Sequence, residues 1–145
     1  MTTLDGEGAA LVGNAVCAVL DPSVVAVGGM TMGADPIAVA TAITATAAGR
    51  PLRAFSVRKE AKGHGTGGRI VGEIGRGDRV AVVEDTTTTG GALLDVVAVL
   101  AEAGAEIVQV IALVDRSDGR VGEVLAGRGL RYTALLTPGD LGVGP

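Results

Sequence analysis

The chain has 145 residues, of which 48% are hydrophobic and 1% aromatic, and its formal net charge is −4. This length suits one globular domain with a substantial core. The acidic balance offers no surplus of cations for nucleic-acid phosphates, and one Phe and one Tyr offer almost no surface for stacking bases, so we expect no nucleic-acid partner.

The cysteine count and the hydropathy pattern indicate the cellular compartment in which we expect the protein. Cys17 is the only cysteine, so the sequence predicts no internal disulfide and a reducing environment. The longest uncharged run, residues 36–49, is too short to span a bilayer, and the first residues lack the basic region of a signal peptide. We therefore expect a soluble cytoplasmic protein, without a membrane partner, that forms a single domain over residues 1–145.

The first half of the chain alternates helical and strand patterns. Residues 4–20 place Leu11, Ala15, Ala18 and Val19 at helical spacing, which predicts a helix that ends at Asp21-Pro22. The short apolar run at residues 24–27 predicts a buried parallel strand that leads into a glycine-rich loop at residues 28–33. Asp35-Pro36 then predicts the start of a helix that reaches about residue 48.

The same alternation continues to the end of the chain. The sequence predicts strands at 52–57, 80–84, 107–114 and 132–136, helices at 91–103 and 119–127, and a glycine-rich loop at 58–72 whose return side could hold a short strand at 70–74. Helices and strands that alternate at this spacing predict an α/β fold, with a central, mostly parallel five-stranded sheet flanked by helices on both faces.

The end of the predicted central strand carries the most informative stretch. The apolar run at residues 80–83 is followed by Glu84 and Asp85, then by four threonines and two glycines before the next helix. Parallel sheets bind ligands at this end of their strands, and backbone N–H groups, hydroxyls and a helix N-terminus all favour a phosphate. No Gly-Lys-Thr/Ser follows, so this is not a Walker loop. The alternative is an ordinary strand–turn–helix in which Thr88 or Thr89 only caps the helix.

A cationic loop follows the predicted strand at residues 52–57. Residues 58–69 contain Arg58, Lys59, Lys62 and Arg69 together with His64, the only histidine, and several glycines. A hinged cationic loop could close over a polyphosphate and exclude water, although a simple solvated charged loop is the alternative. The loops after residues 27, 57, 84 and 114 should meet at one edge of the sheet, which predicts a shared site there.

Two motifs resemble those of a known family. Residues 58–68, RKEAKGHGTGG, are similar to the flexible catalytic loop of orotate phosphoribosyltransferases, and residues 82–91, VVEDTTTTGG, resemble the motif with which type I phosphoribosyltransferases bind phosphoribosyl diphosphate (PRPP). With Val114-Asp115-Arg116, the resemblance extends from about residue 4 to residue 141. It implies a type I phosphoribosyltransferase fold and a Mg²⁺-dependent transfer of the phosphoribosyl group from PRPP to orotate, giving orotidine 5′-monophosphate and diphosphate in pyrimidine biosynthesis.

The resemblance also implies roles for individual residues. Lys62, His64 and Asp85 would be catalytic, Thr88 and Arg116 would contact orotate, and Glu84 and Asp85 would help place the water ligands of Mg²⁺ that PRPP carries. The residues implied to bind PRPP are Arg58, Lys59, Lys62, His64, Glu84, Asp85, Thr86, Thr87, Thr88, Thr89, Gly90, Gly91, Ala92, Thr31 and Met32.

The family pattern further implies a homodimer in which the flexible loop reaches the neighbouring subunit's site. Two departures stand out: Met32 lies where many members have a lysine, and an N-terminal segment that forms a hood over the base in family members is expected to be missing. A phosphoribosyltransferase that uses another base, or a non-catalytic module that binds PRPP, are the alternatives.

Overall fold

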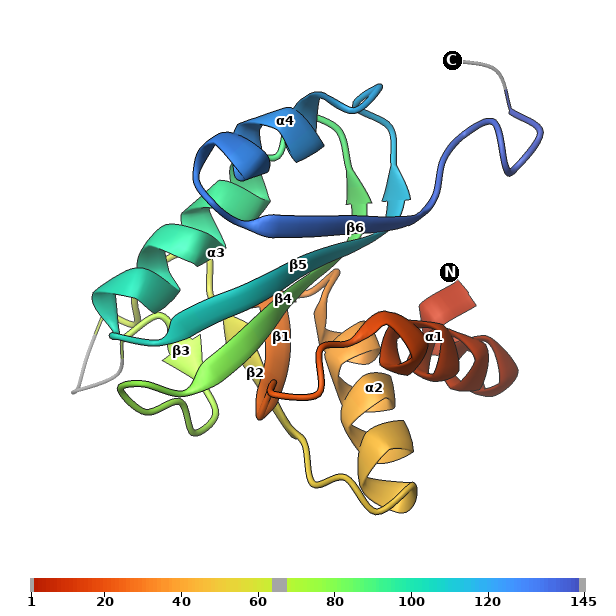
Figure 1. The fold of residues 1–145 in the computed structure, drawn as a ribbon. Helices are drawn as coiled ribbons and strands as arrows, with labels where there is room; N and C mark the ends of the chain where they lie inside the picture. The colour runs from red at the N-terminus through yellow and green to blue at the C-terminus, as the bar shows by residue number, and fades with distance from the viewer. Residues whose placement is uncertain (1, 64–67, 144–145) are drawn as a thin grey trace.

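The computed structural model describes residues 2–63 and 68–143 (Figure 1). Four α-helices and six strands follow one another along these residues after a short 3-10 turn at Thr2–Leu4. The helices are α1 (Gly6–Val19), α2 (Asp35–Ala47), α3 (Gly91–Glu102) and α4 (Arg120–Gly127). The strands are β1 (Ala26–Met30), β2 (Arg53–Val57), β3 (Ile70–Val71), β4 (Arg79–Thr87), β5 (Glu106–Asp115) and β6 (Arg131–Leu136).

The strands form one sheet in the order β3-β2-β1-β4-β5-β6. Five of them are parallel, as the sequence predicts, and only β3 is antiparallel to its neighbour β2. The predicted count of five strands is therefore wrong by one, because the return side of the cationic loop pairs with β2 and adds a short strand at the sheet edge. The α/β class and the covering of both faces are confirmed.

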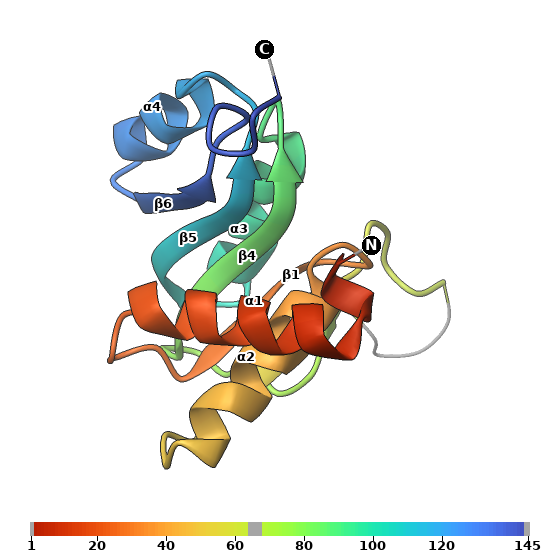
Figure 2. The ribbon, with the colours of Figure 1, turned by 90° about the vertical axis from the view of Figure 1, so that its right-hand side faces the viewer.

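Helices α1 and α2 lie on one face of the sheet and α3 and α4 on the other (Figure 2). Successive side chains of the buried strand β4 point to opposite faces of the sheet. Ala81 and Val83 pack in the core under α1 and α2, whereas Val80 and Val82 pack in the core under α3 and α4. No helix in the described ranges is long and apolar enough to cross a membrane.

Two strands extend further than the sequence predicts. β1 continues through Gly28 and Gly29 to Met30, and a Cβ added to Gly28 would lie 2.1 Å from the carbonyl oxygen of Phe55. β4 continues to Thr87, where Thr86 and Thr87 pair with β5. The predicted loops at residues 28–33 and 86–92 therefore shorten, because β2 holds Gly29 and Met30 in the ladder and β5 holds Thr86 and Thr87.

Helix α1 has the predicted position but buries a different face. Leu11 and Ala15 are exposed, whereas Gly8, Gly13 and Val16 are buried. A Cβ at Gly13 would lie 2.7 Å from the carbonyl oxygen of Ala40, so the glycine allows α1 and α2 to approach closely. Periodicity alone could not identify this contact face, because it is made partly of glycine.

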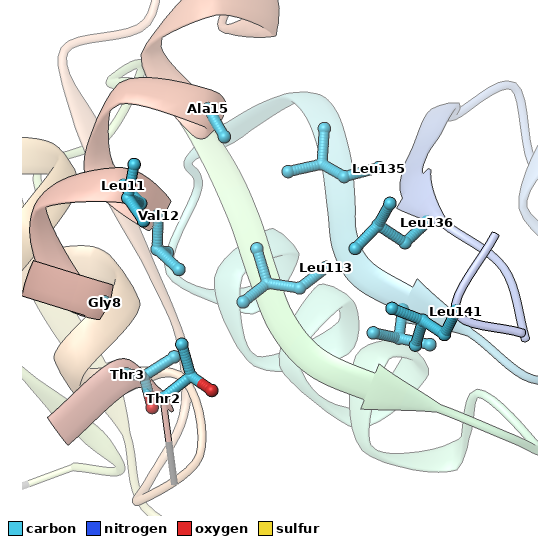
Figure 3. Close-up of a pocket in the computed structure, with 11 residues that line it drawn as sticks. Thr2, Thr3, Gly8, Leu11, Val12, Ala15, Leu113, Leu135, Leu136 and Leu141 are labelled. Carbon is cyan, nitrogen blue, oxygen red and sulfur yellow. The ribbon is translucent and has the colours of Figure 1, made fainter. Parts of the chain in front are cut away.

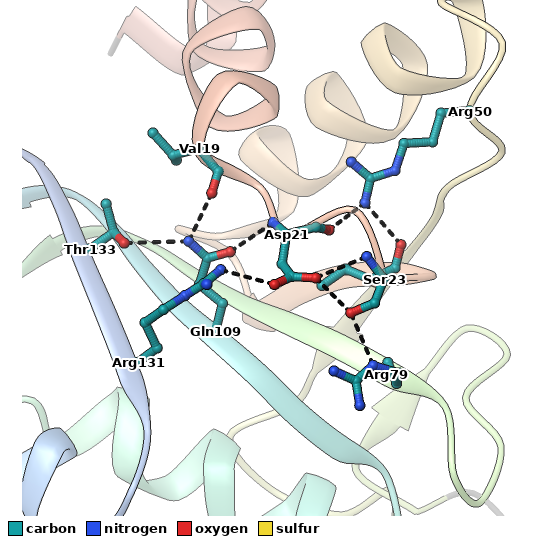
Figure 4. A network of polar contacts seen from close by, with 9 residues as sticks. Val19, Asp21, Ser23, Arg50, Arg79, Gln109, Arg131 and Thr133 are labelled. Carbon is teal, nitrogen blue, oxygen red and sulfur yellow. Dashed lines mark hydrogen bonds and ion pairs between the residues drawn. The ribbon is translucent and has the colours of Figure 1, made fainter.

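A polar network fastens the end of α1 to the N-terminal ends of the strands (Figure 4). The buried Gln109 amide donates to the carbonyl oxygen of Val19 at 2.9 Å and accepts from the Asp21 N–H at 3.0 Å. Arg50 donates to the carbonyl oxygen of Asp21 at 2.6 Å, and Arg131 contacts the Asp21 carboxylate at 3.3 Å. The network satisfies buried polar groups at the sheet edge opposite the candidate site, so we assign it a structural role.

Candidate active site

Four loops meet at the C-terminal edge of the parallel strands, as the sequence predicts. The loop after β1 lies beside the end of β4, since a Cβ added to Gly33 would be 3.4 Å from carboxylate atoms of both Glu84 and Asp85. The Thr31 N–H donates to the carbonyl oxygen of Val57 at 2.9 Å, which joins this loop to the end of β2. The Arg116 N–H donates to the carbonyl oxygen of Thr87 at 2.9 Å, which joins the ends of β4 and β5.

Hydrogen bonds from backbone N–H groups near the end of β4 hold the carboxylates of Glu84 and Asp85. Glu84 is only 9% exposed, whereas Asp85 is half-buried. The Asp85 N–H donates to Oε1 of Glu84 at 3.1 Å, and the Thr86 N–H donates to Oδ1 of Asp85 at 2.5 Å. Because residue 33 is a glycine, no side chain covers the two carboxylates from that side. Their oxygens can therefore accept hydrogen bonds from the hydroxyls of a sugar.

Burial raises the pKa of Glu84 from its ordinary value of 4.5 to about 7. The adjacent Asp85 carboxylate adds to this increase, and the N–H of Asp85 opposes it by donating to Glu84. A carboxyl group held partly protonated near neutral pH is typical of a functional site, because ligand hydroxyls or a cation can then draw it into its ionised form.

The raised pKa of Glu84 should make the free energy of unfolding depend on pH. Between pH 4.5 and about pH 7 the folded chain keeps a proton on Glu84 that the unfolded chain has released, so stability falls as pH rises through that window. Glu84→Gln, which cannot ionise, should exceed the parent at pH 8 by on the order of 1–2 kcal/mol and match it at pH 4. Urea unfolding of both proteins at the two pH values measures this, with Glu123→Gln on the exposed side of α4 as control. A gain of the same size at pH 4 would contradict the assignment.

The turn between β4 and α3 presents hydroxyls and a helix N-terminus at the same edge. Gly90 is the N-cap of α3, with a φ of 79° that favours glycine. The Thr89 hydroxyl accepts from the Gly91 N–H at a long 3.4 Å, and both Thr88 and Thr89 are exposed. Neither threonine is therefore the helix cap of the alternative interpretation, and their hydroxyls remain available to an anion beside the positive end of α3.

The base of the cationic loop is closed by a pair of arginines. The Arg58 N–H donates to the carbonyl oxygen of Arg69 at 2.7 Å, and Nε of Arg69 donates to the carbonyl oxygen of Arg58 at 2.7 Å. The Arg69 guanidinium also forms a two-fold ion pair with Asp95 of α3, one contact of which is 2.8 Å. Hydrogen bonds from Arg69 lower the pKa of Asp95. Arg69 is thus an anchor, and its partner, which lies 26 residues away, has no local signal in the sequence.

Two of the predicted loop cations, Lys59 and Lys62, take no part in this anchor. Lys59 and Lys62 are exposed, and neither forms an ion pair with another described residue. His64 lies outside the described residues. The structure therefore brings Arg58 to the sheet edge through the end of β2, and it leaves the two lysine ammonium groups available to a ligand.

A further polar group at this edge, the Asp35 carboxylate, is not predicted from the sequence. Asp35, which the sequence predicts only as the start of a helix, accepts a hydrogen bond from Oγ1 of Thr31 at 2.8 Å and another from the Ser56 hydroxyl. The spacing of Thr31 and Asp35, four residues apart, could have suggested the first contact. The second depends on the pairing of β1 with β2 and has no local signal.

A separate apolar pocket of about 560 Å³ lies between α1 and strands β5 and β6 (Figure 3). Leu11, Leu113, Leu135, Leu136 and Leu141 point into it. None of its lining residues carries a charge. It therefore does not suit a phosphate, whereas the exposed threonine hydroxyls and the N-terminus of α3 lie at the open sheet edge.

The fold and the acidic pair at the end of β4 are those of a phosphoribosyltransferase, and a family model agrees. Residues 18–123 match the family model described as phosphoribosyl transferase domain. This match includes the loop after β1, the cationic loop, the whole of β4 and the first turn of α4.

Individual relatives show which phosphoribosyltransferases this chain is similar to. The chain is 49% identical over 142 residues to an orotate phosphoribosyltransferase of Streptomyces avermitilis, which covers 97% of this chain and 78% of that protein. The crystal structure of Mycobacterium tuberculosis H37Rv orotate phosphoribosyltransferase with Fe(III) dicitrate superposes with a TM-score of 0.84 at 43% identity, over 98% of this chain and 79% of the other. The same enzyme in complex with PRPP gives a TM-score of 0.81 at 40% identity, over 97% and 79% of the two chains. The chain belongs to the orotate phosphoribosyltransferase family.

Proposed function

We propose that this chain transfers the 5-phosphoribosyl group of PRPP to orotate, forming orotidine 5′-monophosphate and diphosphate. The observation that carries the proposal is the carboxylate pair Glu84 and Asp85, held at the end of β4 between the glycine loop at Gly33 and the threonine turn before α3. A relative of 40% identity was crystallised with PRPP, which supports this substrate. All of residues 1–145 would act as a single phosphoribosyltransferase domain.

The two ends of PRPP would bind on opposite sides of the carboxylates. The 5′-phosphate would bind along residues 86–92, where the exposed hydroxyls of Thr86, Thr88 and Thr89 lie near the N-terminus of α3. Thr87 is buried, so only its backbone could contribute. The ribose hydroxyls would donate to Glu84 and Asp85. The diphosphate would then extend toward the loop after β1, which contains Thr31 and Met32.

The chemistry requires positioning and positive charge, with no protein nucleophile. A ring nitrogen of orotate attacks the anomeric carbon and loses its proton to the departing diphosphate or to water. The carbon–nitrogen bond forms, and the carbon–oxygen bond to diphosphate breaks with its electron pair on the leaving oxygen. Lys62 and His64, with Arg58 and Lys59, would stabilise the negative charge that develops on the diphosphate. Arg116, which follows β5 and is exposed, would pair with the carboxylate of orotate, and Thr88 would contact the same base.

The acidic pair also fits a magnesium ion. Within the described ranges no group of three His, Cys, Asp or Glu side chains could enclose a metal. Magnesium usually keeps several water ligands beside substrate phosphates, and the Glu84 and Asp85 oxygens would accept hydrogen bonds from those waters. When bound, the ion would neutralise phosphate charge. Because Glu84 has a pKa of about 7, we expect ligand binding at neutral pH to release a proton.

We further propose a homodimer with sites shared between subunits. The cationic loop leaves the sheet edge beyond β2, and Lys59, Glu60 and Lys62 are all exposed. These exposed residues would reach the site of a neighbouring copy, as the family resemblance implies. Equal amounts of the Lys62→Ala and Asp85→Asn proteins, mixed and assayed together, test this arrangement.

The proposed reaction is tested by assaying the purified protein with PRPP, Mg²⁺ and a panel of bases. Orotate should be consumed with release of one diphosphate for each nucleotide formed, and adenine, guanine, hypoxanthine and uracil should give little product. Turnover of another base without turnover of orotate would reject orotate as the substrate. Binding of PRPP in calorimetry without product from any base would indicate a non-catalytic module.

A further inference from the structure

We propose that Asp35 is a positioning residue that holds the loop after β1 in the conformation that binds diphosphate. This inference rests on the proposed function. Asp35 is the first residue of α2, and its carboxylate accepts from Oγ1 of Thr31 at 2.8 Å and from the Ser56 hydroxyl. One side chain thus connects the loop after β1 with the strand from which the cationic loop departs.

The position of Asp35 in the fold supports this bridging role. It lines one shallow pocket with Met32 and Gly33, and another with Ser56. The backbone provides a parallel connection, because the Thr31 N–H donates to the carbonyl oxygen of Val57. Asp35 therefore lies between the two segments expected to contact the leaving group.

The hydrogen bonds also restrict what Thr31 can do. A threonine hydroxyl has one hydrogen, and that of Thr31 is given to Asp35. While this bond is present, Thr31 cannot donate its hydroxyl to a phosphate. Among the described residues no partner accepts from the N–H groups of Met32 or Gly33, so these backbone groups are the donors left to the diphosphate. The side chain of Thr31 anchors the loop, and the neighbouring backbone would bind the anion.

The charge of Asp35 argues against direct contact with the ligand. A carboxylate beside a diphosphate would repel it unless the negative charge were engaged elsewhere. Here two hydroxyls donate to it, and it lies in the first turn of α2, where the helix dipole stabilises a negative charge. These contacts favour a positioning role over a ligand role.

The test compares binding of two fragments of PRPP in the presence of Mg²⁺. Asp35→Asn keeps the shape of the side chain but replaces one acceptor oxygen with an NH₂ group, which cannot accept from a hydroxyl. We expect its affinity for inorganic diphosphate to fall about tenfold, the size expected when a charge-assisted hydrogen bond is lost. Affinity for ribose 5-phosphate, which would bind at the opposite end of the site, should stay within about twofold of the parent. Calorimetry measures both constants.

Ser56→Ala provides a second variant that leaves the Asp35 charge and the Thr31 contact in place. It should weaken diphosphate binding in the same selective way, and combining it with Asp35→Asn should give less than the product of the two separate losses. Unchanged diphosphate affinity in both variants would overturn the inference. So would an equal loss for ribose 5-phosphate, since that would indicate general structural damage. A parent protein that binds neither fragment would instead reject the proposed function.

Discussion

Lys62→Ala is expected to lower turnover by a factor of about 100 to 1,000 while PRPP affinity falls less than about tenfold. The Lys62 side chain is exposed on the cationic loop and forms no ion pair with another described residue. Among residues 2–63 and 68–143, no acidic side chain therefore pairs with the Lys62 charge. Because the leaving diphosphate gains negative charge as the bond breaks, a lysine contact there should strengthen in the transition state and affect kcat more than binding.

Single-turnover kinetics and calorimetry separate these two effects. Arg128→Ala is the matched control, because it removes an exposed cation at the end of α4, away from the loop, and should leave both quantities unchanged. If Lys62→Ala turns over as fast as the parent, the catalytic role of Lys62 is wrong. If PRPP affinity falls as much as turnover, Lys62 contributes to ground-state binding only.

Asp85→Asn should have its largest effect on binding, with PRPP affinity reduced by about ten- to one-hundredfold. Asp85 is half-buried near the end of β4 and beside Gly33, where it would contact a sugar bound between the two loops proposed to bind phosphate. The amide keeps the size of the side chain but loses the negative charge and one acceptor oxygen that the ribose hydroxyls would use. Calorimetry with PRPP and Mg²⁺ measures the change.

Glu123→Gln again serves as the control, since it removes one negative charge from the exposed side of α4. PRPP affinity equal to that of the parent in Asp85→Asn would exclude Asp85 from the ribose site. The same loss in Glu123→Gln would point to overall charge as the cause.

Mixing the two impaired variants, assayed at a PRPP concentration too low to saturate Asp85→Asn, tests the shared site. If the loop of one subunit completes the site of the other, a dimer of Lys62→Ala and Asp85→Asn has one site with both native residues. An equal mixture should then recover about a quarter of the parent activity, since half of the dimers are mixed and half of their sites are intact. An equal mixture that shows only the average of the two variants' activities would place the loop in its own subunit's site.

Short sequence patterns were sufficient to predict most of the fold and the position of Glu84 and Asp85 at the sheet edge. The apolar run before Glu84 predicts a buried strand, Asp35-Pro36 predicts a helix start, and the structure contains both elements. Glu84 and Asp85 could be placed at a sheet edge because consecutive parallel strands end on the same side. Each of these inferences depends on residues that are close together in the chain.

The tertiary structure decided the features that depend on distant residues. β1 and β4 extend beyond their predicted ends because pairing with neighbouring strands holds Gly29 and Thr86 in the sheet. Arg69, one of the predicted loop cations, pairs with Asp95 across 26 residues.

The sequence by itself determined the class of fold, the carboxylate pair and the cationic loop, because periodicity and motif are properties of neighbouring residues. Only the folded chain decided which polar groups face one another. Asp35 and Ser56 meet because β1 and β2 pair in a particular register, and Glu84 acquires its raised pKa because the sheet buries it. Such contacts and desolvation depend on the whole surrounding structure, so no short stretch of sequence contains them.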